Sequence, residues 1–203
     1  MIKLYDFPLS GHAHRVRLML SLLGLDYELM PVDLASGEQK TDEFLQLNPF
    51  GAVPVLVDGD VVLRESTAIL VYLARAYAPE WYPSDPRAQA DVQTWLATAT
   101  KDIVAGPGAA RLVTVFNADF DHPSLIEKSH TLLQLIDAHL AGRQWLAQDR
   151  PTIADIAAYS YIAHAPEGHV SLEPYGNIRQ WLAGVGRLPG FVGMPKTEVA
   201  AAA

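Results

Sequence analysis

The sequence contains no cysteine. A chain without cysteine has no disulfide bonds, no thiolate metal ligands and no cysteine nucleophile. Redox chemistry of the CxxC type is excluded for the same reason. One missing residue type therefore removes four classes of chemistry at once.

Long apolar runs and basic clusters are also missing. The longest apolar run, residues 18–25, is interrupted by Ser21 and Gly24 and is too short to span a bilayer. Residues 1–15 have no basic stretch leading into an apolar core, so no secretory signal is visible. The net charge is −8, and no run of Lys or Arg stands out. We therefore expect a cytoplasmic protein whose partners include neither nucleic acid nor a membrane.

The chain divides at a cluster of three prolines within residues 79–86. Strand patterns occur only before this cluster, and helical patterns alone follow it. With 203 residues, half of them hydrophobic, the chain is long enough for two cores. We predict an α/β domain over residues 1–80, a linker over 79–86 and an all-helical domain over 87–203.

The first 80 residues predict the element order β-α-β-α-β-β-α. Residues 2–7 and 27–32 have strand patterns, and between them apolar residues recur at helical spacing (Val16, Met19, Leu20, Leu23). A crossover of that length makes the two strands parallel. Farther on, Asp58-Gly59-Asp60 separates two short apolar segments, which is a hairpin signal. A short amphipathic turn at Phe44 and a helix after Ser66 complete the order.

The second part predicts helices over four segments, 87–105, 123–141, 153–163 and 175–184. Gly106-Pro107-Gly108 must end or kink the first of them. Thr152 and Asp155 form a capping box in which each side chain caps the other's amide, so we expect Asp155 to be structural. The last residues, Glu198-Val199 and four alanines, show no packing pattern.

Three segments could hold a ligand, and each also has a structural interpretation. Pro54, at the entry to an apolar strand, indicates either an edge strand or a cis-proline that turns the preceding backbone toward a ligand. Ser66, after Glu65, can cap a helix or, together with the helix N-terminus, bind a carboxylate. Ser10 can likewise cap the helix after it or donate a hydrogen bond to an anion. No metal site is predicted, because the histidine spacings are unsuitable.

Four segments, in this order, resemble the cytosolic glutathione transferase family. They are residues 48–56 (NPFGAVPVL, similar to NPxGxVPxL), 65–69 (ESTAI, similar to ESxAI), 150–155 (the helix cap) and 175–191 (similar to PNIxxW…LPGF, with Gly176 in place of the proline). The resemblance covers roughly residues 1–195. It implies a thioredoxin-like domain followed by a C-terminal helical bundle domain, in a serine-type bacterial member of uncertain class.

The resemblance also implies a glutathione site. Val53 would offer its backbone to the cysteinyl part of glutathione, because Pro54 would be cis. Glu65 would hold the γ-glutamyl ammonium group, and Ser66 the γ-glutamyl carboxylate. Lys40 would hold the glycyl carboxylate. Glutathione would be a co-substrate, and no permanently bound cofactor or metal is expected.

By the same resemblance, Ser10 is the catalytic residue that activates the glutathione thiol. Lowering the pKa of a thiol from ~8.5 to ~6.5 needs about 2.7 kcal/mol. A charge-assisted hydrogen bond supplies roughly 1.5–3 kcal/mol and a helix N-terminus up to ~1 kcal/mol, so a donor at Ser10 is sufficient. His12 departs from the family pattern and is a candidate accessory donor or substrate contact. Tyr5 is the alternative activating group, but it lies within a strand pattern.

The implied reaction joins the glutathione thiolate to a small hydrophobic electrophile. The electrophile would lie between the loop at Phe7 and the helical domain, near Trp95, Ile103 and Arg111. Two alternatives stay open: a glutathione-dependent peroxidase or isomerase using the same site, and a binding protein of the same fold without turnover. The resemblance further implies a homodimer.

Overall fold

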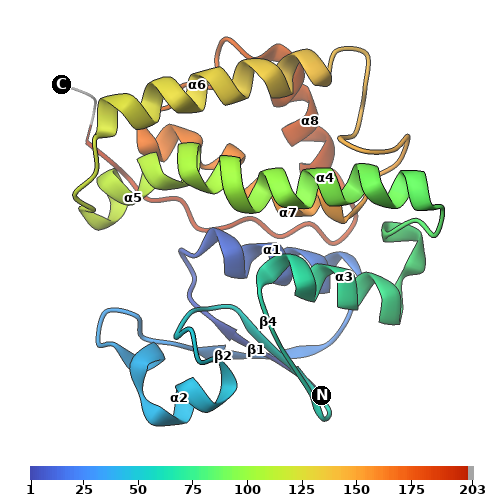
Figure 1. The fold of residues 1–203 in the computed structure, drawn as a ribbon, viewed down its shortest axis with the longest axis vertical. Helices are drawn as coiled ribbons and strands as arrows, with labels where there is room; N and C mark the ends of the chain where they lie inside the picture. Colours follow the sequence, from blue (N-terminus) through green and yellow to red (C-terminus); the bar gives the residue numbers. More distant parts are fainter. Residues whose placement is uncertain (201–203) are drawn as a thin grey trace.

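The computed structural model describes residues 1–200, so the last three alanines of the C-terminal tail lie outside the described residues. Its first part is built on a four-stranded sheet of order β2-β1-β3-β4, and its second part is helical (Figure 1). The strands are β1 (Ile2–Asp6), β2 (Tyr27–Pro31), β3 (Val55–Asp58) and β4 (Val61–Arg64).

The strand pairing follows the predicted topology. β1 pairs with β2 in parallel, and with β3 in antiparallel orientation. β3 and β4 form the predicted hairpin, in which Gly59 adopts a φ of 62°. Since β3 lies between β1 and β4, it has a hydrogen-bonded neighbour on each side.

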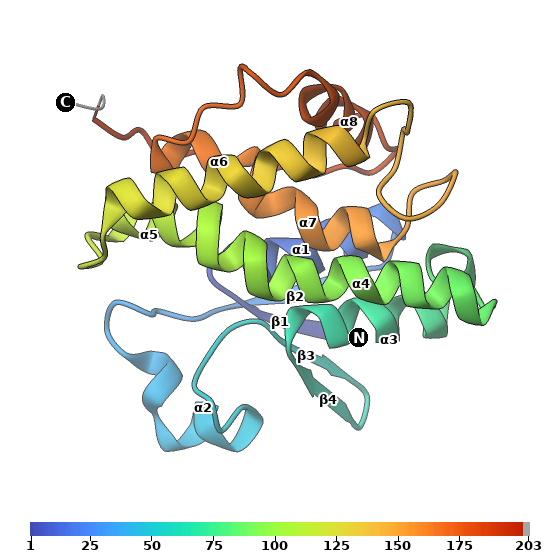
Figure 2. The same cartoon turned by 45° about the horizontal axis from the view of Figure 1, so that its top comes forward.

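Three α-helices accompany the sheet: α1 (Gly11–Leu22), α2 (Asp42–Leu47) and α3 (Ser66–Tyr77). α1 and α3 cover the face that meets the helical part, while α2 lies on the opposite side (Figures 1 and 2). Phe44 of α2 packs edge-on against Tyr5 of β1, with ring centroids 6.0 Å apart. This confirms the predicted order and the thioredoxin-like arrangement.

The second part contains α4 (Pro86–Ile103), α5 (Ala109–Phe116), α6 (His122–His139), α7 (Ile153–Ala163) and α8 (Gly176–Gly186). A π-helical turn, Val104–Gly108, joins α4 to α5, so the Gly-Pro-Gly segment interrupts the first helix, as predicted, but helical structure continues directly beyond it. α7 is almost wholly buried and packs on both α1 and α4 (Figure 2). It is the element that joins the two parts. The predicted linker, residues 79–86, runs from the end of α3 to the start of α4.

A strap formed by residues 190–200 runs along the seam between the two parts (Figure 1). Ser21 of α1 donates to the carbonyl oxygen of Gly190 at 2.6 Å. Nε2 of His14 donates to the carbonyl oxygen of Val192 at 2.9 Å, and Nδ1 of the same ring is 2.8 Å from the hydroxyl of Ser160 in α7. The strap therefore meets α1 at a histidine that also contacts the helical part.

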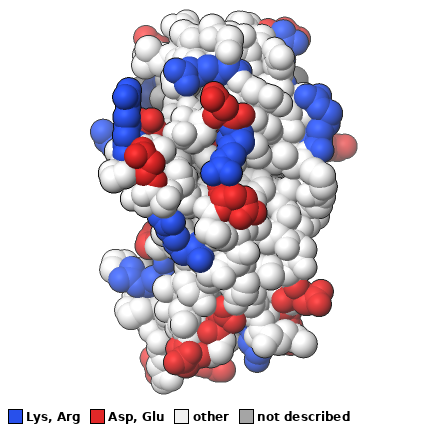
Figure 3. All heavy atoms as spheres, turned by 90° about the vertical axis from the view of Figure 1, so that its right-hand side faces the viewer, with Lys and Arg blue, Asp and Glu red and all other residues white. Residues whose placement is uncertain are grey.

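Charge is interspersed on the surface shown in Figure 3, where basic and acidic side chains alternate and several acidic ones gather toward the lower end. Along residues 1–200, no helix is both long enough and apolar enough to cross a membrane.

Candidate functional site

A cavity of about 140 Å³ opens where three elements of the first part meet. Its walls come from the first turn of α1, the segment before β3 and the start of α3. The lining residues are His12, Asn48, Ala52, Val53, Pro54, Glu65 and Ser66. Five of these were candidate site residues from the sequence, and the structure brings all five together.

The peptide bond between Val53 and Pro54 is cis. The alternative interpretation of Pro54, as a mark of an edge strand, is wrong because β3 is an internal strand. Val53 lies before β3 begins at Val55, so its amide and carbonyl groups do not belong to the sheet ladder. Val53 lines the cavity, where an extended peptide could pair with its backbone.

Glu65 and Ser66 form the junction between β4 and α3. Glu65 occupies the N-cap position with a φ of 68° and a ψ of 110°, and its side chain makes no capping hydrogen bond. Ser66 is the first helical residue, so its interpretation as the cap is wrong. The amides in the first turn of α3 are left without a side-chain acceptor. Such an uncapped N-terminus, carrying partial positive charge, is suited to an anionic ligand.

Ser10 is the N-cap of α1. Its Oγ accepts a hydrogen bond from the amide of Ala13 at 3.2 Å. The capping interpretation of Ser10 is therefore confirmed. It does not compete with donation to an anion, because a hydroxyl that accepts one hydrogen bond still has its own hydrogen to donate.

Arg15 lies behind the cavity wall and joins two of its residues. Its Nη1 donates to Nδ1 of His12 at 2.9 Å and to Oγ of Ser66 at 3.2 Å. Because a guanidinium only donates, Nδ1 of His12 must accept, and the ring proton is on Nε2. Burial, together with the charge of Arg15, lowers the pKa of His12 to about 3. His12 is therefore a neutral donor at physiological pH.

No sequence pattern indicated Arg15, whereas Asn48 lies within a recognised segment. Asn48 belongs to the NPFGAVPVL segment, is buried, and donates from Nδ2 to the carbonyl oxygen of Ala52 at 2.7 Å. It shapes the loop that carries Val53. Lys40 does not line the cavity: its Nζ lies 3.3 Å from the carbonyl oxygen of Gly51, in the same loop.

The residues predicted to contact the electrophile lie elsewhere. Phe7 packs against Phe116 of α5, with ring centroids 6.3 Å apart. Ile103 is fully buried in the main hydrophobic core. Arg111 is also buried: its Nε donates to Glu167 at 2.6 Å and its Nη1 to the carbonyl oxygen of Leu9 at 3.0 Å. Arg111 thus ties the loop before α1 to the helical part.

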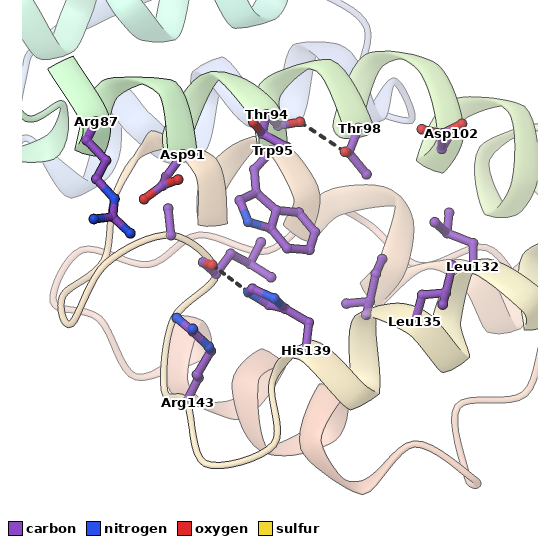
Figure 4. Close-up of a pocket in the computed structure, with 13 residues that line it drawn as sticks. Arg87, Asp91, Thr94, Trp95, Thr98, Asp102, Leu132, Leu135, His139 and Arg143 are labelled. Atoms are coloured by element: carbon purple, nitrogen blue, oxygen red, sulfur yellow. Dashed lines mark hydrogen bonds between the residues drawn. The ribbon is translucent and has the colours of Figure 1, made fainter.

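Trp95, which the sequence suggested near that loop, lies instead in a hollow of about 590 Å³ between α4 and α6 (Figure 4). Its ring is 4.8 Å from that of His139, which donates to the carbonyl oxygen of Leu146. Leu135, on the rim of the hollow, is 67% exposed. Within residues 1–200 no group of three or more His, Asp or Glu side chains is arranged to hold a metal ion.

A thioredoxin-like sheet joined to a helical bundle, with an uncapped helix N-terminus beside a cis-proline, is typical of the glutathione transferase fold. Residues 1–75 match the family model "Glutathione S-transferase, N-terminal domain", and residues 120–189 match "Glutathione S-transferase, C-terminal domain". The chain therefore belongs to the glutathione S-transferase family and is a transferase.

Individual relatives agree along most of the chain. Glutathione S-transferase 3 of Zea mays is 34% identical over 206 residues, covering 94% of this chain and 91% of the relative. Glutathione S-transferase Z2 of Arabidopsis thaliana is 34% identical, covering 94% and 88%. The crystal structure of a glutathione S-transferase from Pseudomonas fluorescens superposes with a TM-score of 0.90 at 32% identity, covering 95% of this chain and 98% of that one.

Proposed function

We propose that this transferase joins the thiolate of glutathione to a small apolar electrophile, with the Ser10 hydroxyl as the donor that stabilises the thiolate. The observation that carries the proposal is the uncapped N-terminus of α3, which opens into the same cavity as Val53 and His12. An anion bound at that end, in an extended conformation along Val53, would run toward the start of α1, where Ser10 lies.

The cavity offers complementary groups to each part of glutathione. Ser66 and the first amides of α3 would bind the γ-glutamyl carboxylate. The carboxylate of Glu65, exposed and without a strong partner, would bind the ammonium group. The backbone of Val53 would pair with the cysteinyl residue. Nζ of Lys40 makes long hydrogen bonds of 3.3–3.4 Å to the carbonyl oxygens of Phe50 and Gly51. It would give these up to bind the glycyl carboxylate.

The electrophile would bind where the two parts of the chain present apolar side chains to solvent. Phe7 comes from the loop before α1, while Leu112 and Phe116 of α5 are 37% and 41% exposed. The guanidinium of Arg111 lies 5.7 Å from the ring centroid of Phe116 and holds the carbonyl oxygen of Leu9. Arg111 would therefore act here by fixing this surface, and Ile103 by supporting it from within the core.

We also infer that the protein is a cytoplasmic homodimer, as the family resemblance implies. The hollow between α4 and α6 supports this, because it combines a sizeable concave surface with an exposed apolar side chain at Leu135 and a partly buried one at Leu132 (Figure 4). A second copy of the chain would cover these side chains.

The experiment that tests the proposed function measures glutathione binding and turnover on the same preparation. Glutathione should bind in titration calorimetry, and the ultraviolet absorbance of its bound thiolate should give a pKa about two pH units below that of free glutathione. Aryl halides should then be conjugated. A panel of hydroperoxides and isomerisable substrates assayed beside them decides whether the thiolate serves another reaction. Binding with an unshifted thiol and no turnover would contradict the proposal and favour a binding protein.

A further inference from the structure

We propose that Arg15 is a positioning residue of the glutathione site, a buried guanidinium without a carboxylate partner in the described chain that is matched by the γ-glutamyl carboxylate of bound glutathione. This inference rests on the proposed function, since it names a residue that would hold the same ligand. Arg15 does not line the cavity, and it would act through Ser66 and His12, which do.

Arg15 differs from the other buried arginines in having no counter-ion. Three arginines are buried in the described part of the chain, and two of them have carboxylates: Arg17 pairs with Asp6 at 2.7 Å, and Arg111 with Glu167 at 2.6 Å. Arg15, with no exposed surface, forms no ion pair within residues 1–200. A buried charge without a counter-ion is costly. A bound carboxylate would therefore supply the negative charge that the surroundings of Arg15 lack.

The neighbours of Arg15 are neutral acceptors that leave part of the guanidinium unused. Besides His12 and Ser66, it donates from Nη2 to the carbonyl oxygen of Ala99 at 2.9 Å, and the ring of Tyr161 lies 5.5 Å from its Cζ. Its Nε is buried without a partner. Burial lowers the pKa of Arg15 to about 10, so the group is still charged at neutral pH.

The charge of Arg15 reaches the cavity through the hydroxyl of Ser66. Oγ of Ser66 accepts from Arg15 and lies 3.4 Å from Nδ1 of His12, a long contact, so the Ser66 hydroxyl can turn its hydrogen from His12 to a carboxylate in the cavity. A hydroxyl that accepts from a cation is polarised and becomes a stronger donor. A carboxylate bound to Ser66 would be two hydrogen bonds from the guanidinium, roughly 5–6 Å away, where their attraction is little screened in a protein wall.

The same charge would set the orientation of the ligand. The γ-glutamyl end of glutathione carries both a carboxylate and an ammonium group. In a site without a positive and a negative side, the ligand could bind with these two groups in either position. Arg15 makes the Ser66 side positive, and the carboxylate of Glu65 makes the outer side negative. Arg15 also occupies Nδ1 of His12, so that His12 presents only its Nε2 hydrogen. The arrangement accepts the zwitterion in one orientation.

The test compares two ligands by titration calorimetry on the whole protein. One is glutathione, and the other is 4-aminobutanoyl-cysteinyl-glycine, which lacks only the γ-glutamyl carboxylate. Wild type should bind the second ligand at least about 30-fold more weakly. In the neutral variants Arg15→Met and Arg15→Gln, glutathione itself should bind about 30-fold more weakly, and removing the carboxylate should then cost no more than about 3-fold. Arg15→Lys should recover part of the discrimination.

Arg17→Met is the matched control, because Arg17 is a buried arginine of the same helix with its own carboxylate partner. This variant should unfold at a lower temperature yet discriminate between the two ligands as wild type does. Equal discrimination by wild type and by the neutral Arg15 variants would overturn the proposal, as would failure of both neutral variants to fold. If wild type binds no glutathione, the proposed function itself is wrong, which is a different result from either of these.

Discussion

The indole nitrogen of Trp181 in α8 donates a hydrogen bond of 3.0 Å to Oδ1 of Asp155 in α7. Asp155 is fully buried, and the same carboxylate accepts from the amides of Leu146 and Thr152, each at 2.9 Å. The predicted capping box is present. Its acidic member also joins α7 to α8 and to the loop before α7.

Replacing Asp155 by Ala should lower the free energy of unfolding by about 3 kcal/mol or more, because several buried donors lose their acceptor together. Trp181→Phe removes one of them and should cost about 1 kcal/mol. Urea denaturation of both variants measures the difference, and the affinity for glutathione should be unchanged when the proteins are folded. A loss below about 1 kcal/mol for Asp155→Ala would show that the carboxylate is no more than a local cap.

Ser10→Ala should raise the pKa of the bound glutathione thiol toward its free value while leaving glutathione affinity within a few-fold. At neutral pH, a rise of ~2 in the pKa of the bound thiol lowers the thiolate fraction more than tenfold, and turnover should fall with it. The lost cap should also cost about 1 kcal/mol of stability. Ser10→Thr, which keeps the hydroxyl and the cap, is the control. Identical titrations of the bound thiol in wild type and Ser10→Ala would show that Ser10 does not activate the thiol, and His12 or Tyr5 would then be the candidates.

Glu65 can be replaced in two ways that separate binding from backbone strain. Its positive φ is unfavourable for any residue but glycine. Glu65→Ala keeps that strain and should cost about 2–3 kcal/mol of glutathione affinity, because the ligand ammonium loses its partner. Glu65→Gly should weaken binding equally, yet stabilise the free protein by about 1 kcal/mol. Calorimetry and thermal melting give the two quantities, and unchanged affinity in both variants would remove Glu65 from the site.

The free protein should lose stability as the pH falls from about 6.5 to about 4. Burial, with a smaller effect of the nearby charge of Arg17, lowers the pKa of His14 to about 4. Since the unfolded chain binds more protons than the folded one in this window, acid favours unfolding, by up to about 1.4 kcal/mol per pH unit for this group. Below about pH 4 the contribution levels off.

The matching variant is His14→Gln, which removes the titrating group but can still donate to the carbonyl oxygen of Val192. Denaturation by urea at half-unit pH steps should show a shallower slope for this variant than for wild type. Carboxylates that titrate in the same range are common to both proteins and cancel in the comparison. Parallel curves would mean that His14 is protonated in the folded state.

Leu135→Glu should convert the dimer to a particle near the chain mass of 22.2 kDa in sedimentation, because it places a charge on the apolar rim between α4 and α6. Leu29→Glu is the control, since Leu29 is another exposed leucine, on the edge strand β2. Wild type sedimenting as a monomer at micromolar concentration would contradict the homodimer. If Leu135→Glu is still dimeric, the interface does not include Leu135 and lies on another surface.

Local patterns predicted the elements of the fold well where they carry a period or a turn signal. The Asp-Gly hairpin and the helix over 153–163 are present as predicted. Helix α5 was not predicted, because Gly106-Pro107-Gly108 indicates the end of a helix, whereas the chain continues through a π-helical turn directly into α5. This turn packs against residues far away in the sequence: Ser129 of α6 lies against Gly106. A local pattern does not contain that information.

The site was predictable as far as single segments carry it. Val53, Pro54, Glu65 and Ser66, which the resemblance placed at one site, line one cavity together with His12, which departs from the family pattern. Arg15 was not predictable, because its burial depends on Ala99, a residue 84 positions away on a helix of the second part. Ile103 and Trp95 were expected near the electrophile, but Ile103 lies in the core and Trp95 lines the hollow between α4 and α6. A helical pattern of apolar residues does not reveal whether a given residue faces a core or a cleft.

The strap along the seam has a consequence for how the protein is made. His14, near the start of the first helix, finds its hydrogen-bond acceptor at Val192, 178 residues later. A ribosome releases the sheet and α1 long before that acceptor leaves the exit tunnel. During this interval the imidazole has no Val192 to donate to, and one side of α1 is uncovered. The amino-terminal domain therefore reaches its final state only after Val192 has left the tunnel, although its own residues emerge earlier.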